Sequence, residues 1–316
     1  MLPTPPGDNS HVWAAARVPG TCGELVQGYL DGEHMIITAP INRYSLAIAV
    51  PGAPTGKWRL STPDAPKTRQ ALSAAESAGW VHGEGTVSLY SALQRGKGMG
   101  SSTADAAAAV AAACLAGGLP CQPEALGRLL AAIEPTDGTM HEGIVLFNSL
   151  TGQMAARWSC PDLRLAIVDW GGTVDTLTFH QKAQLKRNGI ALTNGALDRD
   201  AHFRAAMTRR AFTAVMRGLE SGNPRLIGWG ASLSAFIHQR YLYKPGLEKL
   251  HGLVDALGGY GLCIAHTGTI AGLLFPPEKA TANRKKIKTA LARSFPFLNW
   301  LGWARLCDGG LAAYRP

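Results

Sequence analysis

The amino-acid sequence predicts an α+β fold arranged in two domains. Its 316 residues are about twice the length of an average domain of roughly 150 residues. Hydrophobic residues make up 46% of the chain and charged residues 17%, so the chain can fill a core and is not intrinsically disordered. In the second half, the expected strands and helices follow one another in an order typical of an α+β domain, unlike the regular alternation of a doubly wound sheet.

The first half is expected to consist of strands with a few helices. Apolar side chains recur at every second position over 42–50, as in a strand, and at helical spacing over 68–78. The first strand is expected to end at Pro19-Gly20, and a helix that begins near Ser101 ends before Gly117-Gly118. The expected strands cover 11–18, 35–38, 42–50 and 86–92. The expected helices cover 68–78, 101–115 and 123–133.

The second half begins with a strand and is then mainly helical. Gly171-Gly172 ends that strand, and a glycine-rich loop at 266–272 separates two later ones. The expected strands cover 163–169, 262–265, 273–275 and 300–306. The expected helices cover 177–192, 198–220, 224–240, 246–257 and 278–294. We therefore expect a disordered tail over 1–10, an N-terminal domain over 11–172 and a C-terminal domain over 173–316.

The chain carries an excess of positive charge, which favours anionic partners. Lys and Arg total 31 against 22 acidic residues, a formal net charge of +9. Nucleic acid and small phosphorylated ligands both satisfy this preference. The basic residues are scattered, and the dense run at 284–288 is expected on the solvated face of a helix. Because no basic stripe is interleaved with aromatic residues, nucleic acid is not the expected partner.

Cysteine usage and the apolar segments indicate in which cellular compartment the protein is expected. The 6 cysteines form no CxxC pair and have no zinc-ligand spacing, so we expect no disulfide framework and a reducing cytoplasm. The N-terminus lacks the basic and apolar regions of a signal peptide. The apolar run over 104–116 is too short to span a bilayer, so we expect no membrane association.

The segment 95–103 carries the strongest chemical signal, because a glycine-rich turn lies there between a strand and a helix. Glycines permit positive φ and can turn backbone N–H groups toward an anion. Ser101 and Ser102 are expected to cap the helix, whose N-terminus favours phosphate, and Lys97 adds a cation. One of these hydroxyls can also reach a magnesium ion that bridges phosphates. The spacing matches neither a P-loop nor a dinucleotide fingerprint, so a tight turn with a helix cap is the competing interpretation.

Three further segments contain residues suited to a binding site. The segment 19–24 contains two glycines and an acid, and is otherwise a turn that ends a strand. Glu134 and Asp137 stand three apart after a helix, and Pro135 prevents simple continuation of that helix, so both carboxylates can face a cleft. Surface acids at a helix end are the competing interpretation. The remaining segment, 266–272, is a glycine loop between a strand and an apolar run.

In this order and spacing, the four segments resemble the GHMP kinase superfamily, which includes galactokinase, homoserine kinase and mevalonate kinase. RGKGMGSSTAD at 95–105 is similar to the phosphate loop of that family, and HTGTIAG at 266–272 is similar to its C-terminal glycine loop. PGTCGELVQG at 19–28 and EPTD at 134–137 resemble the L-threonine kinase branch in particular, as does the stretch 169–176. The resemblance covers most of the chain after residue 12.

The resemblance implies a two-domain GHMP kinase fold, with an N-terminal domain like ribosomal protein S5, a ferredoxin-like C-terminal domain and the site between them. It implies ATP and Mg²⁺ as cofactors. It implies L-threonine as the substrate, phosphorylated to O-phospho-L-threonine for cobalamin side-chain synthesis. The residues implied in nucleotide binding are Gly96, Lys97, Gly98, Met99, Gly100, Ser101, Ser102 and Thr103.

The resemblance also implies roles for acidic residues and hydroxyls. Ser102, with Ser101 as the alternative, and Glu134 would hold the magnesium ion, and Asp137 would accept the proton of the substrate hydroxyl. Glu24 would bind the substrate ammonium, and backbone N–H groups of 20–23 the carboxylate. The substrate-binding residues implied in all are Gly20, Thr21, Cys22, Gly23, Glu24, Asp175, Thr267 and Gly268.

Other functions stay open at this point. A kinase of the same fold could act on serine, ethanolamine or homoserine, and a decarboxylase is a further alternative. An S5-like domain in a chain with a net charge of +9 would also suit an RNA-binding protein. A small amino-acid substrate is the expected partner, and a homodimer is compatible with the sequence.

Overall fold

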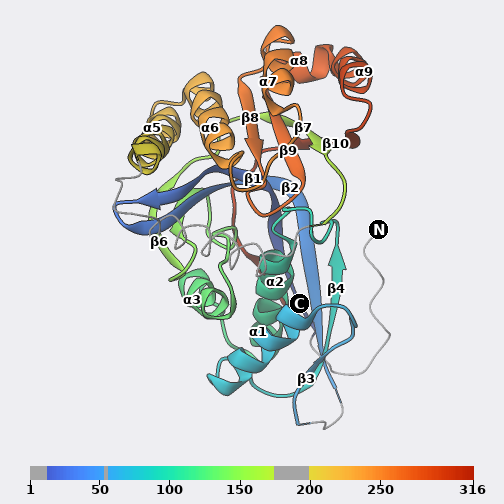
Figure 1. The fold of residues 1–316 in the computed structure, drawn as a ribbon. Coiled ribbons are helices and arrows are strands. Elements are labelled where there is room, and N and C mark those ends of the chain that lie inside the picture. The colour runs from blue at the N-terminus through green and yellow to red at the C-terminus, as the bar shows by residue number, and fades with distance from the viewer. Residues whose placement is uncertain (1–12, 53–55, 174–198) are drawn as a thin grey trace.

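The computed structural model describes residues 13–52, 56–173 and 199–316, and its strands form one mixed sheet. The main path of that sheet runs in the order β10 (Asn299–Arg305), β7 (Arg164–Asp169), β9 (Ile270–Phe275), β8 (Gly261–Ile264), β1 (Ala14–Leu30), β2 (Glu33–Pro51), β4 (Gly85–Ser91) and β3 (Trp58–Leu60). Three more strands pair outside this path, namely β5 (Ile144–Asn148), β6 (Gln153–Trp158) and β11 (Ala312–Tyr314). Strands of both chain halves therefore meet at β1, which pairs with β2 and with β8 (Figure 1).

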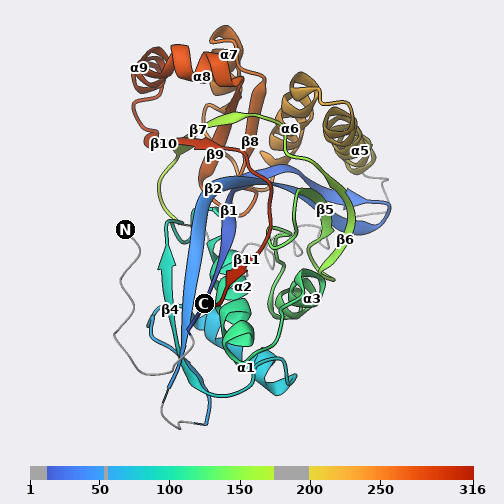
Figure 2. The same ribbon diagram turned by 180° about the vertical axis from the view of Figure 1, so that it is seen from behind.

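Helices cover this sheet in two groups. In the lower group of Figure 1, α2 (Ser101–Ala116) packs on β1, β2 and β4, and α1 (Pro66–Ser77) and α3 (Pro123–Ile133) pack on α2. In the upper group, α6 (Pro224–His238) packs on β1 and β8, α5 (Arg199–Glu220) on α6, and α7 (Leu247–Ala256) on β8. The pair α8 (Pro277–Ala282) and α9 (Arg284–Ser294) completes the upper group. Figure 2 shows from behind that β11 and the C-terminus return to the lower group.

Helix α2 lies in the middle of the core, and its composition explains how it fits there. It consists mainly of alanine, which has the highest intrinsic helix propensity, and every residue except Ser102 and Leu115 is buried. Its acidic residue, Asp105, is buried, and its charge is compensated by two partners. Ser45 Oγ donates to its carboxylate at 2.6 Å, and Arg95 forms an ion pair with it at 3.0 Å. The core therefore fixes the N-terminal end of α2.

The first strand continues past the point where the sequence predicts its end. β1 runs through Pro19-Gly20 to Leu30, and β2 bridges the gap expected between two separate strands. The register between β1 and β2 shifts between Pro19 and Thr21, and again on both sides of Glu24. The shift next to Pro19 accommodates a proline, which has no N–H to donate to the ladder, without ending the strand.

Other elements confirm or correct the expectations from sequence. The α+β class is confirmed, as are the helices that correspond to α1, α2, α3, α5, α6 and α7. The prediction of one helix over 278–294 is wrong, because Asn283 leaves the helical conformation and separates α8 from α9. The sequence pattern does not predict β3, β5, β6 or β11, and β9 begins at Ile270, inside the expected loop.

The expected boundary between the domains falls close to a part of the chain that the structure leaves undescribed. The expected helix over 177–192 and the expected tail over 1–10 also lie outside the described residues. β7, which precedes that boundary, is hydrogen-bonded between β9 and β10 of the second half. The domain limits at 11–172 and 173–316 stay a prediction.

Candidate active site

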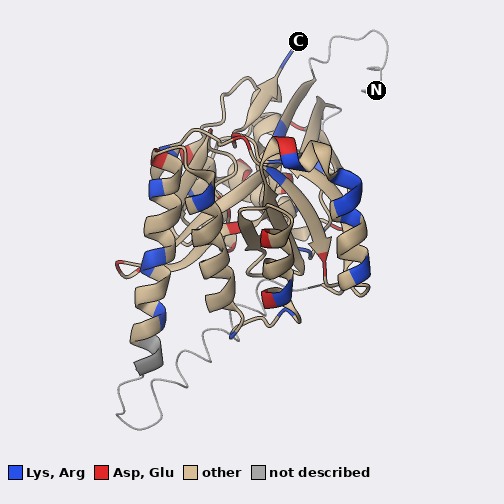
Figure 3. Cartoon of the chain, turned by 90° about the horizontal axis from the view of Figure 1, so that it is seen from above, with Lys and Arg blue, Asp and Glu red and all other residues tan. Residues whose placement is uncertain are grey.

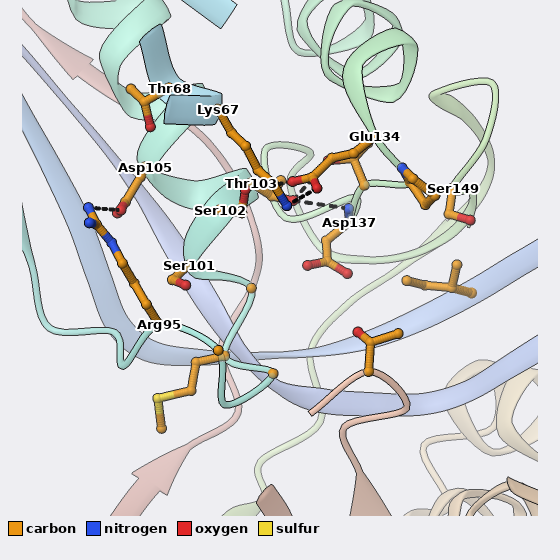
Figure 4. Close-up of a pocket in the computed structure, with 18 of the residues that line it drawn as sticks. Lys67, Thr68, Arg95, Ser101, Ser102, Thr103, Asp105, Glu134, Asp137 and Ser149 are labelled. Carbon is orange, nitrogen blue, oxygen red and sulfur yellow. Dashed lines mark hydrogen bonds and ion pairs between the residues drawn. The ribbon is translucent and has the colours of Figure 1, made fainter. Parts of the chain in front are cut away.

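A pocket of about 270 Å³ opens where segments far apart in the sequence meet (Figure 4). Its walls come from the β1–β2 hairpin, the start of α1, the first glycine loop (95–100), the segment after α3 and the second glycine loop (266–272). The lining residues used below are Glu24, Ile36, Lys67, Arg95, Gly98, Gly100, Ser102, Glu134, Asp137, Ser149 and Thr267. All four segments singled out from the sequence therefore contribute to one pocket.

The first glycine loop has a left-handed backbone at each of its glycines. The φ angle is +69° at Gly96, +86° at Gly98 and +63° at Gly100, in a region that other residues avoid. Gly100 is the N-cap of α2, and no side chain makes a capping hydrogen bond there. The expectation that Ser101 and Ser102 cap the helix is therefore wrong. A left-handed glycine takes that place, and both serines belong to the first helical turn.

The two glycine loops pack so closely that only glycine fits at their contact. A Cβ on Gly98 would lie 2.2 Å from the Cβ of Ala265 and 3.1 Å from the Cα of Gly268. Thr269 N–H donates to the Lys97 carbonyl at 2.9 Å and ties the loops together. The first N–H groups of α2 have no partner within the helix, so with the glycine loop they form a site that fits phosphate groups.

Ser102 and Glu134 contact each other in the pocket. Ser102 Oγ donates to Glu134 Oε1 at 2.6 Å, and Lys67 Nζ forms an ion pair with Glu134 Oε2 (Figure 4). A hydroxyl and a carboxylate are the hard oxygen donors that Mg²⁺ prefers, usually together with phosphates and waters. Within the described ranges, no cluster of three or more His, Cys, Asp or Glu would hold a metal ion without such help. The pair therefore fits a magnesium ion that binds together with a nucleotide.

The Asp137 carboxylate points into the pocket beside the first glycine loop (Figure 4). A Cβ on Gly100 would lie 2.9 Å from Asp137 Oδ2, and Asp137 N–H donates to Thr103 Oγ1 at 3.3 Å. Burial, with added repulsion from Glu24 and Glu134, raises the pKa of Asp137 to about 8. A carboxylate whose pKa lies near neutral pH is suited to accept a proton.

Lys97, expected to contact the nucleotide, is held beside the pocket and does not line it. Its Nζ forms an ion pair with Asp169 at 2.7 Å and donates to the Gly172 carbonyl at 2.7 Å. The side chain thereby connects the first glycine loop to the end of β7. Lys67 and Arg95 are the lysine and arginine that line the pocket in the described part of the chain.

Residues 20–23 lie behind the first glycine loop. Thr21 N–H donates to the Met99 carbonyl at 2.8 Å, and its hydroxyl donates to the Gly98 carbonyl at 3.4 Å. Cys22 is fully buried, and residues 20–23 are absent from the pocket wall. The structure thus places this part of the motif where it supports the loop, with the N–H of Thr21 already engaged.

Glu24 is the residue of that motif that reaches the pocket. Its Oε2 accepts a hydrogen bond from the backbone N–H of His266 at 2.8 Å and lies 2.8 Å from His266 Nδ1. Thr267 also lines the pocket, whereas Gly268 contacts the first glycine loop. Asp175, the other acid expected to bind substrate, lies outside the described residues.

Sequence reasoning missed other residues that line the pocket. These are Ile36 from β2, Lys67 at the start of α1 and Ser149 after β5, and Figure 4 shows Ser149 on the other side of Asp137 from Arg95. An isoleucine in a strand or a lysine at a helix start carries no motif of its own, so only the fold shows that they belong to the site.

Comparisons with known families and relatives agree with this geometry. Residues 67–147 match the family described as "GHMP kinases N terminal domain". The chain is 31% identical to the L-threonine kinase of Salmonella typhimurium over 295 residues, which covers 92% of each chain. It is 29% identical to the L-threonine kinase of Citrobacter freundii over 267 residues, which covers 83% of this chain and 86% of the relative.

Solved structures of low sequence identity share the two-domain GHMP kinase fold expected from the sequence. Homoserine kinase from Cytophaga hutchinsonii has a TM-score of 0.69 at 14% identity, covering 98% of this chain and 100% of that one. Lactococcus lactis galactokinase, in complex with galactose, has a TM-score of 0.67 at 13% identity, covering 95% of each chain. In the described ranges, every helix is too short or too polar to cross a membrane. With 31% identity to a curated relative over most of both chains, this chain belongs to the L-threonine kinase family of the GHMP kinase superfamily.

Proposed function

We propose that the chain is an ATP-dependent kinase that transfers a phosphoryl group to the hydroxyl of L-threonine and forms O-phospho-L-threonine. The observation that carries the proposal is the pocket in which Asp137 lies beside the first glycine loop and the Ser102–Glu134 pair. An anion site, a metal-binding pair and a proton acceptor are thus combined in one cavity, as phosphoryl transfer requires. Relatives named L-threonine kinase support threonine as the acceptor.

In this proposal, the nucleotide phosphates bind at the first glycine loop and the start of α2. ATP with Mg²⁺ supplies the phosphoryl group and neutralises the charge that develops during transfer. The backbone N–H groups of 96–102 would bind phosphate oxygens, and Ser102 and Glu134 would hold the magnesium ion. Lys67 lines the pocket beside Glu134, so its positive charge would lie close to a bound phosphate.

Asp137 accepts the proton of the acceptor hydroxyl. Burial raises the pKa of this carboxyl to about 8, so near neutral pH the ionised form is accessible and more basic than an ordinary carboxylate. Even so, a carboxylate is a weak base for an alcohol. We therefore expect proton transfer to occur late, as the new oxygen–phosphorus bond forms.

The acceptor end of the pocket suits a small amino acid. Glu24 brings negative charge to this end, and a substrate ammonium group close to Asp137 would favour the ionised form of that carboxyl. Hydroxyls of Ser149 and Thr267 can donate to a carboxylate. Ile36 offers an apolar surface for the methyl group that distinguishes threonine from serine.

We extend the proposal to a cytoplasmic role in cobalamin side-chain synthesis, supported by the resemblance of 19–28 and 134–137 to that branch. A homodimer also stays a proposal. The RNA-binding alternative has less support, because Figure 3 shows Lys and Arg along α5 and α9, at opposite sides of that view, and not in one stripe.

A panel of acceptors tests the function directly. The purified chain is supplied with ATP and Mg²⁺ and with L-threonine, L-serine, L-homoserine or ethanolamine, and ADP formation and product mass are measured. We expect L-threonine to give the highest kcat/KM. A faster reaction with ethanolamine would contradict the amino-acid proposal. Failure to form ADP with every acceptor, combined with salt-sensitive RNA binding, would favour the RNA-binding alternative.

A further inference from the structure

Lys244 is buried behind the second glycine loop and takes no part in the mechanism proposed above. It lies in the turn before α7, and its exposed fraction is only 2%. Its Nζ donates to the carbonyl oxygens of Ala265 at 3.0 Å and Gly268 at 2.9 Å. It is the only buried lysine in the described part of the chain. Because burial of an ammonium group is costly unless its donors are satisfied, these two carbonyls are needed to hold it there.

The backbone of Lys244 is fixed as well as its side chain. Gln239 Oε1 accepts a hydrogen bond from Lys244 N–H at 2.8 Å, and Gln239 Nε2 donates to the Lys244 carbonyl at 3.0 Å. Burial lowers the pKa of Lys244 to about 8, an effect that the Glu24 carboxylate opposes. At neutral pH the ammonium group is therefore mainly charged, and hydrogen bonds fix both the side chain and the backbone of Lys244.

Each carbonyl bound by Lys244 belongs to a peptide unit whose N–H serves the site. The N–H of peptide unit 265–266 donates to Glu24 Oε2 at 2.8 Å. The N–H of peptide unit 268–269 donates to the Lys97 carbonyl, in the first glycine loop, at 2.9 Å. In a trans peptide the C=O and N–H bonds point in opposite directions, so one ammonium group polarises and orients both donors.

The two residues that Lys244 binds also form the wall behind the first glycine loop. A Cβ on Gly98 would lie 2.2 Å from the Cβ of Ala265 and 3.1 Å from the Cα of Gly268. Thr267, between them, lines the pocket. A shift of the second glycine loop would therefore displace Gly98 at the nucleotide end of the pocket and Glu24 at the acceptor end.

We propose that Lys244 is a positioning residue for both ends of the pocket, which acts through the second glycine loop on Glu24 and on the first glycine loop. Lys244 does not itself line the pocket. The inference rests on the proposed function for the choice of ligands. Its distinctive consequence is that one substitution behind the pocket should weaken two different ligands together.

Lys244→Met removes the ammonium group and keeps a side chain of similar length. For the folded variant, we expect the Kd for ATP, measured by calorimetry without acceptor, and the KM for threonine each to rise about tenfold. We expect kcat/KM to fall about 100-fold, the scale that follows a misplacement of about 1 Å. Lys249→Met, which removes an exposed lysine of α7, is the matched control and should behave like the wild type. A Lys244→Met variant that only melts earlier, with both ligand affinities unchanged, would show that Lys244 is merely structural.

A second measurement uses the unaltered protein and does not depend on whether the variant folds. The ¹⁵N resonance of a buried, hydrogen-bonded ammonium group should be observable because its protons exchange slowly. We expect this resonance to shift when a non-hydrolysable ATP analogue is added, and again when L-threonine is added. A resonance that neither ligand moves would overturn the proposal. Absence of phosphoryl transfer to threonine by the wild type would instead contradict the proposed function, and the comparison of ATP affinities would still test Lys244.

Discussion

Ser102 and Glu134 are joined by a hydrogen bond of 2.6 Å, which connects the first turn of α2 to the segment after α3. The other oxygen of Glu134 pairs with Lys67 at the start of α1. Three elements that are far apart in the sequence thus converge on one carboxylate. A cation already neutralises that carboxylate, so a magnesium ion would replace one positive partner with another. A substitution of Glu134 should therefore weaken magnesium binding more than it weakens nucleotide binding.

Glu134→Gln keeps the shape of the side chain and removes its charge. We expect the Mg²⁺ concentration for half-maximal activity to rise about tenfold or more, the scale for losing a charged ligand. ATP affinity without Mg²⁺ should change less, because Lys67 stays in the pocket. Glu142→Gln, at an exposed carboxylate, is the control. Magnesium titrations of turnover check this, and an unchanged requirement would remove Glu134 from the metal site.

Asp137→Asn tests the proton acceptor. We expect kcat to fall about 10²-fold or more, the usual scale for loss of a general base, while the Kd for ATP stays the same. The control is Asp162→Asn, which changes an exposed acid away from the pocket. Steady-state kinetics measure kcat, and calorimetry measures the Kd for ATP. Near-full turnover in Asp137→Asn would mean that positioning alone drives the reaction.

The same residue predicts how stability depends on pH. The pKa of Asp137 rises from 3.8 to about 8 on folding, so between these values the folded protein holds a proton that the unfolded chain releases. The contribution of Asp137 to stability is therefore present below about pH 4 and is lost as the pH rises through about 8. Thermal unfolding should show that the Tm of Asp137→Asn rises relative to the Tm of the wild type between pH 5 and pH 8. A constant difference in Tm across this range would contradict the raised pKa.

Gly98→Ala tests the contact between the glycine loops, and Gly32→Ala is its matched control. Both glycines have a φ of +86°, so both substitutions carry a left-handed strain of about 1–2 kcal/mol. Only at Gly98 would the new Cβ meet another atom, at 2.2 Å, whereas Gly32 has open space. Calorimetry should therefore show ATP binding abolished in Gly98→Ala and retained in Gly32→Ala. Equal ATP affinity in both folded variants would remove this loop from the nucleotide site.

The choice between acceptors follows from the chemistry of single groups. Serine lacks only the methyl of threonine, which is worth roughly 1–3 kcal/mol, or about 10- to 200-fold in kcat/KM. Ethanolamine also lacks the carboxylate, so it leaves polar groups of the pocket unpaired and should react more slowly than serine. Ile36→Ala should narrow the difference between threonine and serine. Competition assays at equal concentrations check the order, and an unchanged ratio in Ile36→Ala would place the methyl group elsewhere.

Sequence could predict the parts of this site in which a chemical group and a backbone signal coincide. Gly98 lies in a glycine-rich turn before a helix, and Asp137 follows a proline that ends one, so both are visible locally. Lys244 and Lys67 become meaningful only through partners far along the chain. The sequence does not reveal the course of β1 through Pro19-Gly20 for a similar reason, because pairing with β2 on both sides of this dipeptide outweighs a local turn signal.

The alanine packing of α2 has a consequence for how this protein tolerates change. Positions 104–113 have almost no exposed surface, so any larger side chain there overpacks the core at a cost of about 1–3 kcal/mol. A deep mutational scan would therefore mark this stretch as intolerant, although most of it never meets a ligand. Its loss-of-function map would overstate the extent of the active site. Laboratory evolution toward another acceptor should instead draw its useful variation from the β1–β2 hairpin.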